Sequence, residues 1–189
     1  MTAVRTLLII SIFSASSTLA LAKTSFSDEI VASEQKLSLC STAKIKAYSM
    51  IHVGYSALYM ENCENRNQAF LDRNKFVSFH YDRAIPKRAF IKSTLKTLKK
   101  NLSVEEMQKW QAEIEDFNSN YEDVAKGDQY DICYITGEGL KLYLNDKLIA
   151  SNNSDEFASL YFKVWFGEEP FNDSLKNQLL STNKPPQKT

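Results

Sequence analysis

The segment FASLYFKVWFGEEPFNDSLKNQLL, residues 157–180, decides the fold class of this chain. Up to Phe166 it has a helical composition with apolar side chains on nearly every side. A helix that is apolar all round is buried rather than lying on a surface. Gly167 ends this helix, and after Pro170 a second helix runs to the leucine pair at the end of the segment. The segment therefore predicts a buried helix packed between other layers.

The buried helix must contact more than one neighbour. We expect its sheet-facing side chains to be Phe157, Leu160, Tyr161, Val164 and Trp165. Phe162 and Phe166 are then expected to meet a neighbouring helix.

Alternating apolar residues predict strands elsewhere in the chain. The run 43–59 is long enough for two strands that turn near Ala47–Ser49, and residues 75–83, 129–135, 140–144 and 147–151 continue the pattern. Helical spacing predicts two helices, over 86–101 and after a capping box at SVEE (103–106). Strands alternating with pairs of helices indicate an α+β fold, in which an antiparallel sheet is covered by helices on one face.

The N-terminus resembles a signal peptide over residues 1–22. Arg5 precedes the apolar run LLIISIF (7–13), and Ala20-Leu21-Ala22 forms a small-residue cleavage signature. We expect an exported, periplasmic protein, with an uncleaved membrane anchor as the alternative. No other stretch is long and apolar enough to span a bilayer. The predicted organisation is completed by a loosely ordered lead-in over 23–42, one domain over 43–181 and a disordered tail over 182–189.

Charge and cysteine content limit the classes of function. Without Arg5 the chain has 22 basic and 23 acidic residues, which argues against a dedicated nucleic-acid binder. Three cysteines permit at most one intramolecular bridge, and Cys40–Cys63 is the favoured pair because both flank one predicted hairpin. The sequence leaves open whether that bridge forms. Cys133 is expected to be a small buried apolar group.

No cofactor or metal site is expected. The two histidines, His52 and His80, have no cysteine or second histidine at ligand spacing. Neither a nucleophile elbow nor a phosphate-binding glycine loop is present in the sequence. The lysines at 92, 96, 99 and 100 indicate a solvated helix face, with attraction to anionic lipid or another polyanion as the alternative.

Five segments together resemble the bacterial chalcone isomerase-like family. They are VGYSALY (53–59), HYDRAI (80–85), VAKGDQYDICY (124–134), GLKLYLND (139–146) and DEFASLYFKVWFGEEPFNDSLKNQLL (155–180). The resemblance covers roughly residues 43–181. It implies a curved antiparallel β-sheet packed on one face by a layer of helices, a chalcone isomerase-like open-faced sandwich with an apolar cleft between the layers.

The resemblance also implies where an anion would be held. Plant members cyclise a chalcone to a flavanone and use an arginine near the first hairpin to hold the substrate oxyanion. In AKIKAYSM (43–50) the matching position is Lys46, with Lys44 as the other nearby base. Lysine keeps the charge of arginine but lacks its planar, bidentate fork. Lys46 and Arg83 are therefore only weak candidates for a catalytic role.

Arg83 is a second candidate for anion binding. In a regular strand it shares a face with Phe79 and Tyr81, which would place its guanidinium at the edge of the cleft. There it could hold a carboxylate or enolate. The alternatives are an ion pair with Asp82 or Glu113, or extension into solvent.

Three hypotheses of function follow. The first is a non-catalytic binder of a small apolar anion such as a fatty acid, as in the fatty-acid-binding members of the family. The second is a chalcone isomerase-type intramolecular lyase that uses Lys46 or Arg83 electrostatically. The third is an envelope protein that acts through protein contacts, with its cleft filled by side chains. The expected ligand-binding residues are Lys46, Tyr55, Tyr59, Phe79, Tyr81, Arg83 and Trp165.

Overall fold

A computed structural model describes residues 26–47, 50–69 and 74–181. The predicted signal peptide over 1–22 and the predicted tail over 182–189 lie outside the described residues. Within the described ranges, no helix has the length and apolar character needed to span a membrane.

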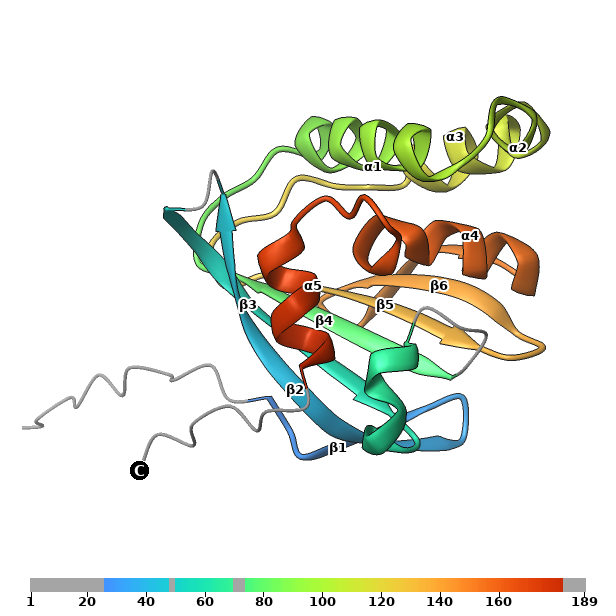
Figure 1. Cartoon of the computed structure of the whole chain (residues 1–189). Helices are drawn as coiled ribbons and strands as arrows, with labels where there is room; N and C mark the ends of the chain where they lie inside the picture. Colours follow the sequence, from blue (N-terminus) through green and yellow to red (C-terminus); the bar gives the residue numbers. More distant parts are fainter. Residues whose placement is uncertain (1–25, 48–49, 70–73, 182–189) are drawn as a thin grey trace, which may run out of the picture.

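One antiparallel sheet forms the base of the molecule. Its seven strands follow one another in sequence order. They are β1 (Glu29–Ala32), β2 (Gln35–Ala47), β3 (Ile51–Met60), β4 (Lys75–Tyr81), β5 (Gln129–Ile135), β6 (Gly139–Leu144) and β7 (Lys147–Asn152). The sheet curls, so that one face is concave (Figure 1). The fold class predicted from the sequence is confirmed.

The helices lie on the concave side of this sheet (Figure 1). The chain contains a short 3-10 helix η1 (Cys63–Gln68) and the helices α1 (Lys87–Asn101), α2 (Val104–Lys109), α3 (Gln111–Ser119), α4 (Asp155–Phe166) and α5 (Asp173–Leu180). The predicted capping box is present, because Ser103 accepts from the Glu106 amide while the Glu106 carboxylate accepts from the Ser103 amide. The helix expected after it is divided at Trp110 into α2 and α3.

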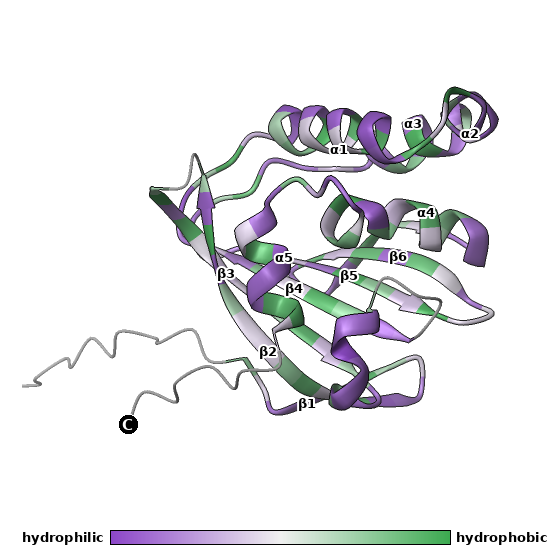
Figure 2. Ribbon diagram, viewed as in Figure 1, coloured by the Kyte–Doolittle hydropathy of each residue, from purple (hydrophilic) through white to green (hydrophobic). Residues whose placement is uncertain are grey.

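Helix α4 lies between the sheet and the outer helices α1 and α3 (Figure 1). This position explains why it is apolar all round, whereas α1 alternates hydrophilic and hydrophobic residues along its length (Figure 2). The predicted faces of α4 are partly wrong. Phe157 and Tyr161 pack against Phe117 of α3, and Phe162 lies under the ammonium group of Lys75 from β4. Trp165 does face the sheet, where it contacts Phe79.

Residues 29–42 are not a loose lead-in, contrary to the prediction. Residues 29–32 form β1, and β2 begins at Gln35. The four-residue strand β1 gains its order from pairing with β2, and Leu37 of β2 is fully buried. This pairing is a tertiary effect that local composition does not reveal. The domain therefore begins before residue 43.

Three β-bulges interrupt the ladder. The extra residues are Cys40 in β2, Val53 in β3 and Ile149 in β7. Bulges bend a strand and increase its twist, which favours the curled sheet. Cys40 is joined to Cys63 of η1 by a disulfide. Cys133 is buried, and its burial raises the pKa of the thiol to about 12.

Candidate functional site

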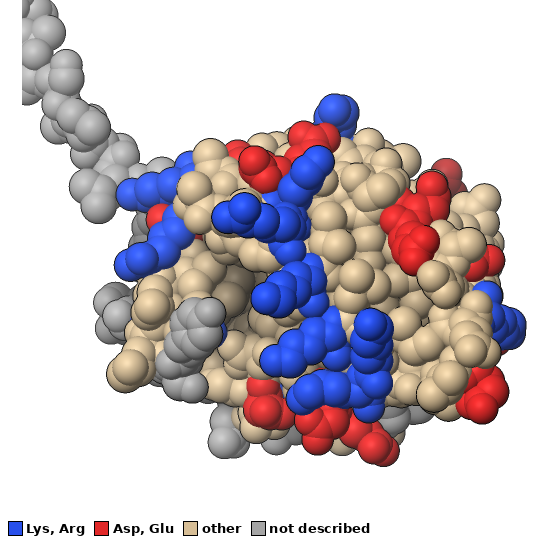
Figure 3. Space-filling model, turned by 90° about the horizontal axis from the view of Figure 1, so that it is seen from above, with Lys and Arg blue, Asp and Glu red and all other residues tan. Residues whose placement is uncertain are grey.

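A cleft of about 970 Å³ opens between the concave sheet and the helices. Strands β2 to β6 supply its floor, α1 and α4 supply its wall, and the start of α5 closes one end. Figure 3 shows the hollow from above, beside α1. The cleft is thus open space, which contradicts the version of the third hypothesis in which side chains fill it.

The interior of the cleft is mainly aromatic and aliphatic. Phe79 stacks at a tilt against Trp165 with ring centroids 5.6 Å apart, and Tyr81 lies edge-on to Phe90 at 5.5 Å. Both strand residues point to the concave face because β4 keeps a regular alternation. The sequence-predicted lining residues Phe79, Tyr81 and Trp165 therefore meet in one cavity.

Most hydroxyl groups around the cleft already have protein partners. The Tyr130 hydroxyl donates to the Glu122 carbonyl and accepts from the Glu122 amide, both at 2.8 Å. The Tyr161 hydroxyl donates to the Asn118 side chain at 2.6 Å and lies 3.2 Å from the Tyr121 hydroxyl. Burial raises the pKa of Tyr121, Tyr130 and Tyr161, so these groups stay neutral.

Tyr81 differs from these neighbours. Across the part of the chain that the structure describes, its hydroxyl has no hydrogen-bond partner, although the side chain is only 6% exposed and lines the cleft. Burial, together with nearby Tyr121 and Tyr130, raises the pKa of Tyr81 well above its usual value. A neutral phenol can donate a hydrogen bond, and a buried donor gains most from a charged acceptor. Tyr81 is therefore the best placed donor for an anionic ligand inside the cleft.

Two cations lie at the opening of the cleft. Lys46 and Arg83 both line it and are both exposed to solvent. The carbonyl of Lys46 accepts a hydrogen bond of 2.9 Å from Asn172, which ties the end of β2 to the start of α5. Neither cation forms an ion pair with any described residue, and Asp82 pairs instead with His52 at 2.6 Å. Both remain available to a ligand anion.

Tyr55 and Tyr59 do not line the cleft, although the sequence prediction placed them there. Tyr55 contacts the ring of His52, and Tyr59 belongs to a second apolar cluster with Leu37 and Phe76. The cause is the bulge at Val53, because one extra residue reverses the direction of every later side chain in the strand. At Gly54 a β-carbon would overlap the His80 carbonyl, so only glycine fits beside the bulge.

Comparisons with known proteins agree with this architecture. The family model described as chalcone isomerase-like matches residues 18–181. The chain belongs to the chalcone isomerase-like family.

Among solved structures, the chain is similar to the crystal structure of a fatty-acid binding protein from Arabidopsis thaliana. The identity is 14%, the alignment covers 80% of this chain and 95% of that chain, and the TM-score is 0.55. No curated protein sequence matches the chain significantly. At this identity the structural likeness establishes the shared fold and nothing finer.

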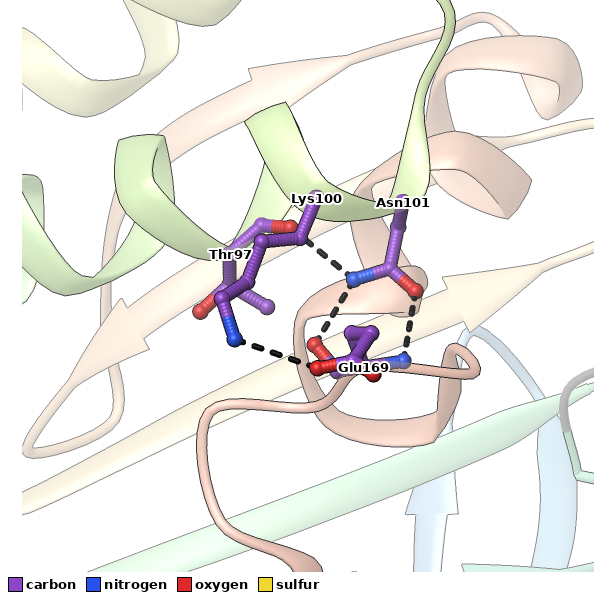
Figure 4. A network of polar contacts seen from close by, with 4 residues as sticks. All are labelled: Thr97, Lys100, Asn101 and Glu169. Carbon is purple, nitrogen blue, oxygen red and sulfur yellow. Dashed lines mark hydrogen bonds and ion pairs between the residues drawn. The ribbon is translucent and has the colours of Figure 1, made fainter.

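In this member of the chalcone isomerase-like family, a polar clip holds α1 against the segment that follows α4 (Figure 4). The Asn101 side chain donates to the Glu169 carbonyl at 2.8 Å and accepts from the Glu169 amide at 3.0 Å. Lys100 adds an ion pair of 3.1 Å with the Glu169 carboxylate. Because α1 forms one wall of the cleft, this clip helps to fix the width of the cavity.

Sequence reasoning missed several residues around this cleft. Phe90, Ser93 and Thr94 line it from α1, and Tyr121 lines it from the segment after α3. Helical spacing predicted the helix itself, but nothing in the local sequence distinguished a cavity wall from a packed core. No cluster of metal-ligating side chains occurs among residues 26–47, 50–69 and 74–181.

Proposed function

We propose that this protein is an exported, non-catalytic binder of a small apolar anion such as a fatty acid. The observation that carries the proposal is an open, aromatic cleft in which the Tyr81 hydroxyl has no hydrogen-bond partner among the described residues, with Lys46 and Arg83 at the opening. Ligand sites commonly have volumes of about 300–1,000 Å³ and combine an apolar lining with a few convergent polar groups. The cleft matches that description at about 970 Å³.

The chemistry of the cleft suits an anion with a long apolar tail. The interior offers aromatic and aliphatic surface for an acyl chain, and each buried methylene contributes about 0.8 kcal/mol. The carboxylate would lie where Tyr81 can donate to it and where the cations at the opening favour its charge. The likeness to a fatty-acid binding protein supports this class of ligand.

Affinity measured across a chain-length series tests the proposal. Calorimetric titration of the delipidated protein with straight-chain carboxylates should give affinities that rise about fourfold per methylene until the cleft is full. Ser93→Trp places a large ring in the cleft and should therefore abolish binding of the longest carboxylates first. Affinity that is independent of chain length would contradict the proposal.

Charge variants separate binding inside the cleft from surface adsorption. Lys46→Gln with Arg83→Gln should weaken carboxylate binding, whereas Lys44→Gln with Lys147→Gln, which also removes two positive charges but none from the cleft lining, serves as a matched control. Lys44 is also exposed and lies two residues from Lys46 on the same strand, but it does not line the cleft. An equal loss in both variants would indicate general electrostatic attraction instead of a site.

Turnover assays address the enzyme hypothesis. A binder leaves chalcone unchanged, whereas an isomerase converts it to flavanone in a manner that depends on Lys46 or Arg83. Export is tested by the mature N-terminus, because signal cleavage after Ala22 would make Lys23 the first residue in intact-mass analysis.

A further inference from the structure

Helix α1 carries a continuous basic surface beside the cleft. It contains six basic residues and no acidic residue. Four of them, Arg88, Lys92, Lys96 and Lys99, follow one another at intervals of four, four and three, so that they lie on one side of the helix. All four are exposed, and none forms an ion pair with a described residue. We refer to these four residues as the basic stripe.

Helix stability does not explain the basic stripe. Like charges three or four residues apart destabilise an isolated helix by about 0.2–0.5 kcal/mol per pair. Lys100 is different, because Glu169 neutralises it within the clip described above. In Figure 3 the basic groups form a band along one side of the hollow, while acidic groups gather at the ends of this band. The positive charge is therefore concentrated next to the opening of the cleft.

Apolar side chains are exposed at the same opening. Met50 is 85% exposed, Ile51 44% and Phe171 37%, and both Ile51 and Phe171 line the cleft. We call these three residues the apolar rim. Contiguous exposed apolar patches that are rimmed by polar groups mark surfaces that contact a partner or a membrane. The cleft thus opens between an apolar rim and a basic stripe.

We infer that this face docks on an anionic lipid bilayer. Basic side chains near an anionic membrane attract its head groups, and neighbouring apolar side chains enter the boundary with the acyl chains. A nucleic acid would complement the charge but would leave the apolar rim in water. A bilayer complements both features and also contains apolar anions. The passage of a ligand from bilayer to cleft rests on the proposed function, whereas docking itself needs no ligand.

Vesicle sedimentation tests the docking. Delipidated protein should pellet with vesicles of phosphatidylglycerol and phosphatidylcholine at low salt, and not with pure phosphatidylcholine. The triple variant Lys92→Gln, Lys96→Gln and Lys99→Gln should lose about a hundredfold in affinity at low salt, since each charge contributes roughly a fivefold effect. The wild-type affinity should also fall as salt screens the charges.

A matched triple variant controls for net charge. Lys36→Gln, Lys44→Gln and Lys147→Gln removes the same charge from exposed positions outside α1 and should retain most of the affinity. Equal losses in the two triple variants, or no pelleting of the wild-type protein with anionic vesicles, would overturn the inference. Binding to heparin without binding to vesicles would overturn it in favour of a soluble polyanion.

Insertion of the apolar rim gives an independent readout. The fluorescence of Met50→Trp should shift to shorter wavelength when anionic vesicles are added. The wild-type protein, which contains only the native tryptophans, provides the baseline. Val31→Trp, at a site 74% exposed on β1 and outside the cleft lining, should not. An unchanged spectrum for Met50→Trp would contradict docking through the rim.

Vesicle-free ligand titration separates this inference from the proposed function. The basic stripe does not line the cleft, so the stripe variant should bind a soluble carboxylate as the wild-type protein does. Ligand binding without vesicle binding would refute only the docking. Vesicle binding without ligand binding would refute only the proposed ligand-binding function.

Discussion

The Tyr81 hydroxyl is the single group whose environment most directly indicates a ligand. The hydroxyl of the neighbouring Tyr130, in contrast, is already hydrogen-bonded to the backbone of Glu122. Tyr81→Phe should therefore leave the free energy of unfolding nearly unchanged while weakening carboxylate binding by roughly tenfold, the value of one hydrogen bond to a charged group. Titration calorimetry and urea unfolding measure the two effects.

The matched control for this variant is Tyr55→Phe. Tyr55 lies outside the cleft against His52, so removal of its hydroxyl should leave carboxylate affinity unchanged. If both variants lose affinity equally, the ligand does not contact Tyr81.

Gly167 illustrates a residue that is required by a close approach and not by backbone conformation. Its φ of −64° is accessible to any residue, but a β-carbon there would overlap both the Asn101 side-chain oxygen and the Lys163 backbone carbonyl. Gly167→Ala should therefore lower the free energy of unfolding by about 2 kcal/mol, as expected for overpacking. Chemical denaturation measures this loss.

A double-mutant cycle identifies the cause of that loss. In an Asn101→Ala background the overlap with the amide is absent, so Gly167→Ala should cost less than it does in the wild-type protein. Additive losses would show that the clip between α1 and Glu169 is not what excludes a side chain at position 167.

At the scale of elements, the disulfide joins the bulged strand β2 to η1. It closes a loop with a sequence separation of 23, for which loop-closure entropy predicts about 3 kcal/mol of stabilisation. Reduction, or Cys63→Ser, should lower the urea midpoint accordingly. Cys133→Ser, which leaves the bridge intact, is the control for the loss of a sulfur atom. An unchanged midpoint after reduction would show that β2 and η1 are held together by packing alone.

The sequence predicted which segments form helices and strands better than it predicted which neighbouring elements they pack against. The apolar pattern over 157–166 predicted a fully buried helix, because only burial on all sides accommodates such a composition. It did not predict which residues meet the sheet, since a sheet and a helix offer the same apolar surface. Only the assembled layers place Phe157 against α3 and Phe162 against Lys75.

Strand faces were predictable only where alternation is unbroken. Phe79 and Tyr81 follow the regular β4 into the cleft, whereas the bulge at Val53 turns Tyr55 away from it. Gly54 was the available signal, because a glycine inside a strand often marks a bulge or a close backbone approach. The family resemblance identified the fold and the region of Lys46, but the free hydroxyl of Tyr81 required the surrounding geometry.

At the scale of the whole molecule, buried tyrosines set its behaviour in alkali. Burial raises the pKa of Tyr59 to about 12 and raises that of Tyr81, Tyr121, Tyr130 and Tyr161. Below pH 10 the folded and unfolded states hold these protons equally. Above pH 10 the folded state holds more of them, so the free energy of unfolding falls as pH rises.

Alkaline titration should therefore show one cooperative step. Tyrosinate absorbance from the buried rings should rise together with the loss of far-ultraviolet circular dichroism, because these rings ionise when the core opens. A gradual rise centred on pH 10, with the dichroism unchanged, would mean that the tyrosines are not buried as described.

The buried thiol of Cys133 has a consequence for recovery after heating. In the folded protein the thiol is buried in β5 and unreactive, because burial raises its pKa. Unfolding exposes the thiol and returns its pKa to about 8.5, so that the thiolate forms and attacks disulfides. Heat-denatured chains at neutral pH should therefore exchange the Cys40–Cys63 bond for mispaired and intermolecular ones, and fail to refold on cooling. Cys133→Ala, or heating in mild acid, should restore reversibility, and non-reducing electrophoresis would show whether covalent dimers disappear. Recovery of the native protein after heating would then depend less on how tightly its layers pack than on whether the Cys133 thiol remains buried.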